Sequence, residues 1–310
     1  MIYTVTLNPA VDKTVEIDDF TAGALNRVRT VRLDAGGKGI NVSKVISSLG
    51  GKSIAMGIVG GTAGRYIKAY LDEHKIENEL FFIPEETRTN LKVVDSKNKQ
   101  NTEINEPGPN VGECELERLK NTLLKRIQTD SIVIFSGSVP SNVSKDIYYH
   151  WIKAIRQKGA KVILDADGEL LMHGIEAGPF LIKPNAYELS QLSGNMMDNE
   201  RQAMVYARRL LDEHGLEMAA VSLGEKGALF IDKTRSVHAH GIKVDVKSTI
   251  GAGDSIVAAL AHSIDKGLSF ERMVRLAMAA ATANVTTSGT QPADLASIRQ
   301  FESRVRLEYL

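Results

Sequence analysis

A glycine-rich loop near the C-terminus carries the residue types best suited to chemistry in this sequence. The loop contains Gly251, Ala252, Gly253 and Asp254, and it runs into small apolar residues whose spacing predicts a helix. Backbone N–H groups at the start of a helix can hold an anion, and glycines let a phosphate approach the main chain closely. The loop therefore indicates phosphate chemistry. An aspartate in a first helical turn is also typical of a helix cap, so the loop alone leaves two roles open for Asp254.

A second glycine-rich segment lies far from the first, at residues 34–42 with the sequence DAGGKGINV, and it also opens an expected helix. Neither segment is a P-loop, because the sequence contains no Gly-x-x-x-x-Gly-Lys-Ser/Thr. A dinucleotide-binding turn is not favoured either, because Asn8, Pro9 and Ala10 follow the first expected strand. Two separate glycine-rich sites suit a phosphoryl transfer between two substrates.

Short β-rich segments alternate with segments of helical apolar spacing over most of the chain, which predicts a doubly wound α/β sheet. The clearest strands are expected at residues 2–7, 53–59, 131–136, 161–165, 180–183 and 219–223. The clearest helices are expected at residues 41–49, 64–74, 113–127, 145–158, 200–214 and 254–266. In such sheets ligands bind beyond the carboxyl ends of the parallel strands, so we expect the site in the loops that follow the strands.

Two stretches, at about 13–34 and 88–105, interrupt this alternation. Their apolar and polar residues alternate singly, which predicts a small accessory β-sheet, a lid, inserted into one α/β domain that spans residues 1–310. An apolar face of so small a sheet needs a cover, which a substrate, a second subunit or both could provide. We therefore expect a homodimer joined through the lids, and a lid that closes over the substrate.

The two glycine-rich segments resemble the two signatures of the ribokinase-like, or phosphofructokinase B, family of carbohydrate kinases. The resemblance continues in order through TLNPAVD at residues 6–12, SGSVP at 136–140, KPNAYE at 183–188 and VSLG at 221–224. It therefore covers nearly the whole chain. It implies a ribokinase-like α/β fold, mainly parallel and flanked by helices, with ATP as phosphoryl donor and Mg²⁺ as the metal.

Within this family, NPAVD at residues 8–12, TNLK at 89–92 and TEIN at 102–105 are similar to segments of the 1-phosphofructokinase branch. This similarity implies fructose 1-phosphate as the acceptor and fructose 1,6-bisphosphate as the product. Fructose 6-phosphate and tagatose 6-phosphate remain alternatives, because the choice of sugar depends on the placement of pocket groups at the scale of an ångström.

The resemblance also assigns roles to the glycine-rich segments. Asp254 is expected to take the proton from the acceptor hydroxyl, and the N–H groups of Gly251, Ala252 and Gly253 to stabilise charge on the transferring phosphoryl group. Contacts to the sugar are expected from Asp12, Gly36, Gly37, Asn41 and Asn90. An alternative for Asp12 is capping of its loop, and an alternative for Lys38, which is also placed at the substrate, is a solvated charge.

The substrate's own phosphate requires fixed cations, and a chain of zero net charge must concentrate them locally. Arg27, Arg88 and Lys92 are the candidates, because the first and last lie in the expected lid and Arg88 opens its second part. Ser138 follows an expected strand and could contact the same phosphate or stabilise its loop. For each cation the alternative is an exposed surface charge.

On the nucleotide side, the resemblance gives Glu188 a water-mediated role at Mg²⁺, and Asp165, at the end of another expected strand, could help. The alternative for Glu188 is favourable pairing with a helix dipole. The remaining expected nucleotide contacts are Lys183, Asn185, Ser222, Gly224, Ser248, Thr249, Gly251, Gly253, Asn284 and Ser288.

Composition excludes several other classes of partner. Lys plus Arg and Asp plus Glu number 38 each, so no global field draws the protein to nucleic acid or to an anionic membrane. No stretch is apolar over the roughly 18 residues of a membrane span, and the one cysteine, Cys114, has no internal partner. We expect a cytoplasmic protein whose partners are a sugar phosphate and ATP. His238 and His240 alternate onto one face of an expected strand, where exposed polar surface is favoured over a zinc site.

Two rival functions remain. A kinase for an unphosphorylated sugar or nucleoside would share the fold and the Gly-Ala-Gly-Asp loop but would not need the three cations. A sugar-phosphate-binding regulator without catalysis would not need Asp254 and Glu188, so the presence of both disfavours it.

Overall fold

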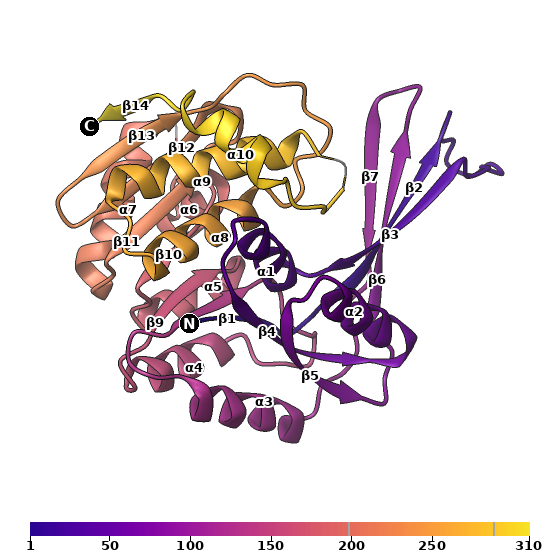
Figure 1. The fold of residues 1–310 in the computed structure, drawn as a ribbon, viewed down its shortest axis with the longest axis horizontal. Helices are drawn as coiled ribbons and strands as arrows, with labels where there is room; N and C mark the ends of the chain where they lie inside the picture. Colours follow the sequence, from indigo (N-terminus) through magenta and orange to yellow (C-terminus); the bar gives the residue numbers. More distant parts are fainter. Residues whose placement is uncertain (198, 288) are drawn as a thin grey trace.

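The computed structural model describes residues 1–197, 199–287 and 289–310. They form a large α/β body and a small sheet that projects from one side of it (Figure 1). The large sheet has ten strands in the order β14-β13-β12-β11-β10-β9-β8-β1-β4-β5. These strands are β1 (Ile2–Thr6), β4 (Ser53–Gly60), β5 (Glu77–Ile83), β8 (Ile132–Ser136), β9 (Lys161–Asp165), β10 (Leu181–Ile182), β11 (Met218–Ser222), β12 (Gly227–Asp232), β13 (Ser236–His240) and β14 (Leu307–Tyr309).

The large sheet is parallel from β11 to β5, and β12, β13 and β14 extend it as antiparallel strands. The predicted doubly wound, mainly parallel α/β fold is therefore confirmed. The strands expected from the sequence are all present. The antiparallel strands β12 and β14 and the edge strand β5 were not among the expected elements, because their flanking turns carry weaker signals.

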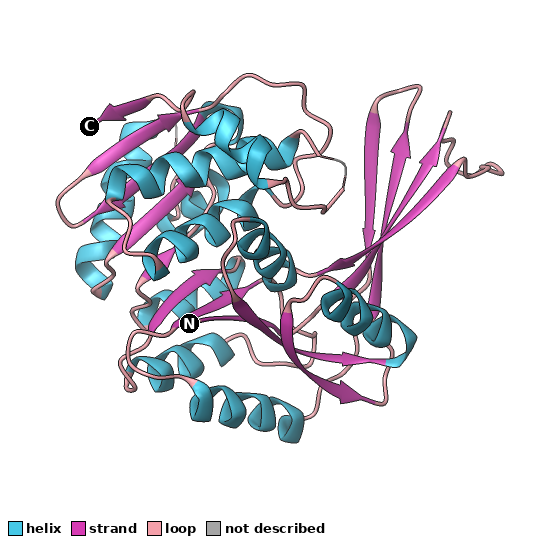
Figure 2. Cartoon of the chain, in the orientation of Figure 1, coloured by secondary structure: helices cyan, strands magenta, loops and turns pink. Residues whose placement is uncertain are grey.

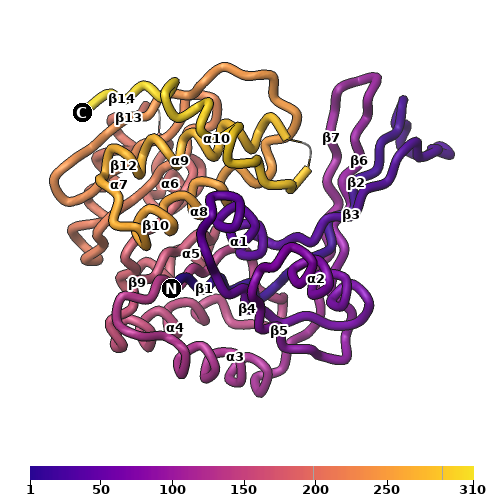
Figure 3. The backbone as a smooth tube through the Cα atoms, viewed as in Figure 1, coloured from indigo at the N-terminus to yellow at the C-terminus, as the bar shows by residue number. Residues whose placement is uncertain are grey.

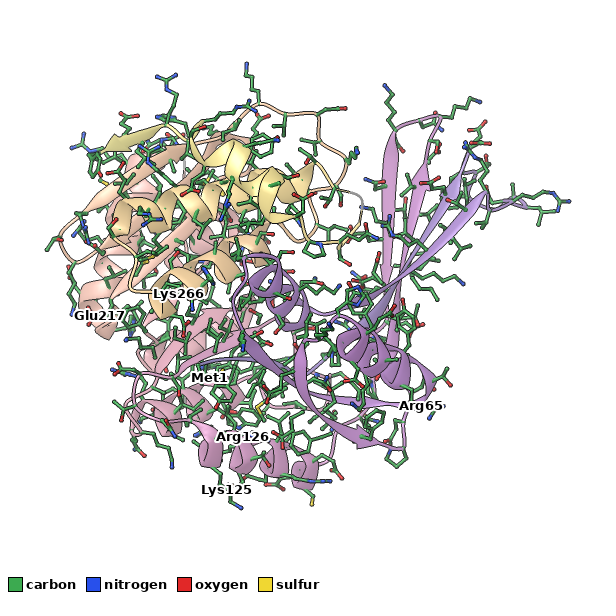
Figure 4. All side chains as sticks on the ribbon, viewed as in Figure 1. Met1, Arg65, Lys125, Arg126, Glu217 and Lys266 are labelled. Atoms are coloured by element: carbon green, nitrogen blue, oxygen red, sulfur yellow. The ribbon has the colours of Figure 1, made fainter. Side chains whose placement is uncertain are left out.

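Helices cover both faces of the large sheet (Figure 2). One apolar core joins the sheet to α3 (Glu113–Arg126), α4 (Ile147–Arg156), α5 (Gly168–Glu176), α6 (Ala186–Ser193) and α7 (Glu200–His214). A second core, on the opposite face, joins it to α1 (Lys38–Ser48), α8 (Ala252–Asp265), α9 (Phe270–Val285) and α10 (Leu295–Glu302). A smaller core lies under α2 (Gly61–Glu73). Side chains fill the space between the sheet and these helices (Figure 4).

The lid is a four-stranded sheet in the order β3-β2-β6-β7. It consists of β2 (Ala10–Ile17), β3 (Thr30–Gly36), β6 (Arg88–Asp95) and β7 (Gln100–Asn105), so both inserted stretches form strands as the alternation predicts. The tube in Figure 3 shows how two hairpins far apart in sequence lie side by side in the lid. The pairing of β2 with β6 is parallel, and the two outer pairings are antiparallel.

Among the described residues, none of the helices combines the length and apolar character needed to cross a membrane. Cys114 is exposed and unpaired, at the start of α3.

Candidate active site

Helix α8 begins without a side-chain cap. Gly251 is its N-cap residue, with φ of 83°, a left-handed conformation that glycine adopts without strain, and no side chain caps this end. Ala252, Gly253 and Asp254 therefore form the first turn with backbone N–H groups that lack an intrahelical acceptor. Such a helix start is suited to hold an anion. The capping alternative for Asp254 does not describe this helix.

The Asp254 carboxylate is buried and lies against the other glycine-rich segment. Its Oδ2 accepts a hydrogen bond of 2.9 Å from Asn41 Nδ2, and its side chain is among those lining a cavity. Burial, followed by the nearby negative charge of Asp165, raises the pKa of Asp254 to about 6. A carboxylate with a pKa close to neutral pH is better matched to accepting a proton from an alcohol than an ordinary aspartate.

Lys44 fixes the orientation of the Asn41 amide. This lysine is fully enclosed in α1, where it donates hydrogen bonds to the Ala35 carbonyl and, over 3.3 Å, to Asn41 Oδ1. Burial lowers the pKa of Lys44 to about 8, against the opposing attraction of Asp34, Asp12 and Asp254. Because Asn41 Oδ1 accepts from an ammonium group, its Nδ2 must face Asp254. Lys44 was not among the residues predicted from the sequence, because it has the spacing of an ordinary helical lysine.

A row of polar residues crosses the lid opposite Asp254. Asp34, Asp12, Asn90 and Asn105 occupy paired positions on β3, β2, β6 and β7. Asp12 Oδ1 accepts a hydrogen bond of 3.0 Å from Asn90 Nδ2, and burial raises the pKa of Asp12. A Cβ at Gly36 would collide with the Asp12 carboxylate, so glycine at that position leaves room for this row. The four strands thus place carboxylate and amide groups side by side across the lid. Together these groups can accept hydrogen bonds from sugar hydroxyls and donate to them.

The row and the α8 loop enclose a cavity of about 350 Å³ between the lid and the large body. Its lining includes half of the site residues predicted from the sequence. These are Asp12, Gly37, Lys38, Asn41, Arg88, Asn90, Lys92, Asp165, Lys183, Gly251, Gly253 and Asp254. It also includes residues that were not selected: Thr14, Asp34, Leu91, Glu103, Asn105, Ile250, Gly289 and Thr290. Asn105 is the register partner of Asn90, and a register between two strands is not specified by the alternation within either one.

A smaller cavity of about 200 Å³ adjoins the first, with Lys38, Arg88, Asn90 and Asn105 lining both. Ser138 also lines the smaller cavity. The Arg88 guanidinium donates 3.0 Å hydrogen bonds to the carbonyls of Glu106 and Asn8, while its buried Nε has no partner among the described residues. The Arg88 charge is therefore held in place by neutral groups and left available for an anion.

The other two expected phosphate-binding cations lie elsewhere. Lys92 Nζ points toward the large body, 3.4 Å from Ser248 Oγ. Lys92 lies four positions after Arg88 on β6, which is about 13 Å of backbone, so the two cations serve different parts of the cavity. Arg27 is exposed in the connection between β2 and β3 and lines neither cavity.

Asp165 lies between two lysines below the α8 loop. Its Oδ1 is 3.1 Å from Lys183 Nζ and 3.5 Å from Lys38 Nζ. Burial would raise the pKa of Asp165, but Lys183 and Lys38 outweigh it and hold the pKa below its usual range. Lys183 also lies beside the α8 loop, because a Cβ at Gly253 would be in van der Waals contact with Lys183 Nζ, at 3.4 Å. Lys38 is thus a partner of Asp165 at the cavity wall and not a solvated charge.

The carboxylates expected at the metal differ in their fit to a divalent ion. Glu188 completes a capping box at the start of α6: its Oε2 accepts from the Asn185 N–H over 2.8 Å, and Asn185 Oδ1 accepts from the Glu188 N–H. This arrangement leaves Glu188 Oε1 outside the cap. The charge of Asp165 is already balanced by two lysines. Glu188 and Asp165 therefore do not fit an ion that both would bind directly. They fit better an ion that is bound to the nucleotide phosphates and that contacts the protein through water.

The remaining expected nucleotide contacts cluster at the ends of β10 and β11 and around the α8 loop. Asn185 pairs with Ser222 through an isolated parallel bridge, and Gly224 begins a short 3₁₀ turn, Gly224–Lys226. Ser248 is buried beside exposed Thr249. Asn284 is buried in α9 next to the α8 loop, because its Oδ1 would be 3.3 Å from a Cβ at Gly251. Ser288 lies outside the described residues.

His238 and His240 lie on β13 as expected, but His238 is only 9% exposed, so the prediction of exposed polar surface is wrong for it. Its ring packs in a cavity under α7, which single-strand alternation does not reveal.

Comparison with known proteins agrees with this geometry. Residues 5–296 match the model of the pfkB family of carbohydrate kinases. The 1-phosphofructokinase of Borreliella burgdorferi is 36% identical over 99% of this chain and 98% of its own. That of Bacillus subtilis is 38% identical over 91% of this chain and 92% of its own.

Among solved structures, phosphofructokinase-2 from Escherichia coli in complex with substrates and products has a TM-score of 0.94 at 28% identity, covering 98% of this chain and 99% of that chain. These matches confirm the resemblance inferred from the sequence motifs. Sugar kinases of this family use ATP and a divalent metal. With a matching family model over nearly its whole length and relatives above 30% identity, the chain belongs to the pfkB family of carbohydrate kinases.

Proposed function

We propose that this ATP-dependent sugar-phosphate kinase transfers the γ-phosphoryl group of ATP to the free primary hydroxyl of fructose 1-phosphate. The products are fructose 1,6-bisphosphate and ADP. The observation that carries the proposal is the placement of buried Asp254, with its raised pKa, in one cavity with the polar row of the lid and the first turn of α8. The names of the two curated relatives support the choice of fructose 1-phosphate.

In this mechanism Asp254 accepts the hydroxyl proton as the new oxygen–phosphorus bond forms and the bond to the ADP oxygen breaks. The N–H groups of the first α8 turn stabilise the negative charge on the transferring group. Lys183, held 3.1 Å from Asp165, adds a fixed positive charge to the same region. Glu188 would hold the metal, which we propose to be Mg²⁺, through water, and the bound ion would supply positive charge to the ATP phosphates.

For the acceptor, Asp12 and Asn90 would bind the sugar hydroxyls, since both line the cavity at the level of Asp254. Its phosphate would lie in the smaller cavity, where Arg88 and Ser138 offer a cation and a hydroxyl. Placing the phosphate at Arg88 turns the other end of the ketohexose toward Asp254. This arrangement favours a substrate that already carries a phosphate over an unphosphorylated sugar.

The protein is further proposed to be a cytoplasmic homodimer joined through its lids. The lid face turned away from the cavity is apolar and partly exposed, with Val31 57%, Leu33 45% and Ile104 54% exposed. A second lid of the same shape would cover these side chains and remove apolar surface from water.

A coupled assay of ADP release tests the function. It compares fructose 1-phosphate, fructose 6-phosphate, tagatose 6-phosphate, fructose and a nucleoside at equal concentrations, with Mg²⁺ and ATP. We expect the highest kcat/KM with fructose 1-phosphate and a selective loss of the phosphorylated acceptors in Arg88→Met. Turnover of only the unphosphorylated acceptors would refute the substrate assignment. Thermal stabilisation by sugar phosphate without any ADP release would instead identify a non-catalytic binding protein.

A further inference from the structure

A cluster of two histidines and a glutamate lies at the β14 edge of the large sheet, on the opposite side of the molecule from the lid (Figure 1). His238 and His240 project from the same face of β13, and their ring centroids are 4.2 Å apart. Glu308 on β14 is the register partner of His238. One potential ligand atom from each of the three residues lies within 4.8 Å of the other two.

The hydrogen bonding of His238 leaves its Nδ1 nitrogen available to bind an ion. Its Nε2 is 3.0 Å from the Lys226 carbonyl oxygen, and because a carbonyl can only accept, Nε2 must carry the proton. In the neutral ring this leaves Nδ1 with a free lone pair. A hydrogen bond from the second ring nitrogen to a backbone carbonyl is the usual outer contact of metal-binding histidines.

Glu308 and His240 are free to adjust. His240 Nε2 is 2.9 Å from Glu308 Oε2, and both side chains are partly open to solvent, at 41% and 56% exposure. Ligand atoms about 2.1 Å from a tetrahedral ion are roughly 3.4 Å apart, so a modest side-chain rotation brings the three groups to bonding distance. They line an open cavity together with Glu200, Arg201, Glu225 and Lys226, in which Glu200 Oε1 pairs with Lys226 Nζ over 3.1 Å.

We propose that His238, His240 and Glu308 bind a divalent transition-metal ion of the zinc type, with water in the remaining position. Two imidazoles and one carboxylate suit Zn²⁺, Co²⁺ or Ni²⁺, whereas Mg²⁺ prefers oxygen ligands alone. The site is separate from the kinase cavity, whose lining shares none of these residues. The ion would join the three-residue strand β14 to β13 and so stabilise the C-terminal edge of the sheet.

A simpler arrangement of the same residues is an ion pair between His240 and Glu308 without a metal. Spectroscopy of the Co²⁺ form separates the two, because bands of a tetrahedral Co²⁺ site require direct ligation by the protein. The experiment uses the untagged full chain, freed of metals by a chelator and kept without nucleotide. Zn²⁺ binding is measured by calorimetry, Co²⁺ ligation by visible absorption and stability by thermal unfolding.

We expect one Zn²⁺ per chain, intense Co²⁺ bands and a higher Tm with Zn²⁺. His240→Asn and Glu308→Gln should each weaken Zn²⁺ binding at least about tenfold and abolish the Co²⁺ bands. His150→Asn is the matched control, because His150 is also an exposed histidine next to a carboxylate, 3.4 Å from Asp146, but has no second histidine beside it. Glu188→Gln controls for metal bound in the kinase cavity.

The proposal is overturned if the wild-type chain binds no Zn²⁺ at micromolar concentration. It is also overturned if the Co²⁺ bands persist unchanged in both His240→Asn and Glu308→Gln, or if His150→Asn or Glu188→Gln removes them. Two variants at different exposed positions keep the test decisive if one of them fails to fold.

Discussion

The side chain of Asn41 donates a hydrogen bond of 2.9 Å to the carboxylate of Asp254 across 213 positions of sequence. This contact joins the two glycine-rich segments where α1 and α8 begin. It places the expected sugar-binding amide next to the expected base. It also leaves Asp254 occupied with Asn41 and the cavity, so the carboxylate is not available as a cap for its own helix.

The acid limb of the pH profile should report Asp254. Its pKa is raised to about 6, and only the carboxylate form can accept a proton, so kcat/KM should fall about tenfold per pH unit below pH 6. Asp254→Asn should lower kcat by at least about 10³-fold, with a much smaller effect on ATP binding. Rates measured from pH 5 to 8, together with nucleotide affinity, check this. Near-normal turnover in Asp254→Asn would remove Asp254 from the mechanism.

The same substitution should stabilise the fold at neutral pH. The pKa of Asp254 is higher in the folded chain, at about 6, than in the unfolded chain, so folding at pH 7 is opposed by the cost of keeping the carboxylate charged. Asp254→Asn removes this cost and should raise the free energy of unfolding by about 2–3 kcal/mol at pH 7.5. The gain should diminish as the pH falls through 6 and vanish near pH 3.5. Denaturant titrations of both proteins at three pH values test this prediction. An equal gain in the free energy of unfolding at every pH would show that the effect comes from packing.

Removing Asp165 and removing Lys183, which both lie below the α8 loop, should shift the acid limb of the pH profile in opposite directions. Asp165 raises the pKa of Asp254 and Lys183 lowers it. Asp165→Asn should therefore shift the limb to lower pH, and Lys183→Met to higher pH. Each variant also breaks a buried ion pair, at a cost of about 3–5 kcal/mol in stability. The double variant Asp165→Asn with Lys183→Met controls for this loss. Shifts of the same sign in both single variants would contradict the assignment of the limb to Asp254.

The sequence predicts the fold, the α8 loop and the lid strands because the signal for each is local. The glycines and the small-residue helix after Asp254 are contiguous, and the single alternation of polar and apolar residues identifies the lid strands. The pairing of Asp12 with Asn90 and Asp34 depends on strand register, which no local pattern specifies. The ion pair of Lys38 with Asp165 joins α1 to β9, so the exposure of Lys38 depends on tertiary packing. Roles that require a bound ligand, such as those of Arg27, Thr249 and Gly224, remain predictions.

Lys44 should act as a positioning residue for Asp254. Its hydrogen bond to Asn41 Oδ1 holds the amide that faces Asp254, although Lys44 is absent from the cavity lining. Lys44→Met keeps the length of the side chain but removes the charge, so we expect kcat to fall about 10–100-fold with little change in KM. Loss of the Lys44 charge should also raise the pKa of Asp254 and so shift the acid limb of the pH profile to higher pH. Lys68→Met on α2, whose partner Asp72 is exposed, is the control. A fall in stability with an unchanged kcat and pH profile would limit Lys44 to a structural role.

The apolar face of the lid should be the dimer contact. Val31 and Leu33 on β3 and Ile104 on β7 are about half exposed on the side turned away from the cavity, so covering each side chain is worth roughly half of the 1.5–3 kcal/mol of a full burial. Leu33→Glu places a charge in the middle of this face, so we expect the dimer to dissociate into monomers at micromolar concentration. Light scattering after size-exclusion chromatography measures the mass. Val205→Glu is the control, because Val205 is 58% exposed and belongs to α7, a helix that lies away from the lid in Figure 1. A monomeric wild-type chain, or a Leu33→Glu variant that remains dimeric, would show that the lids do not join the subunits.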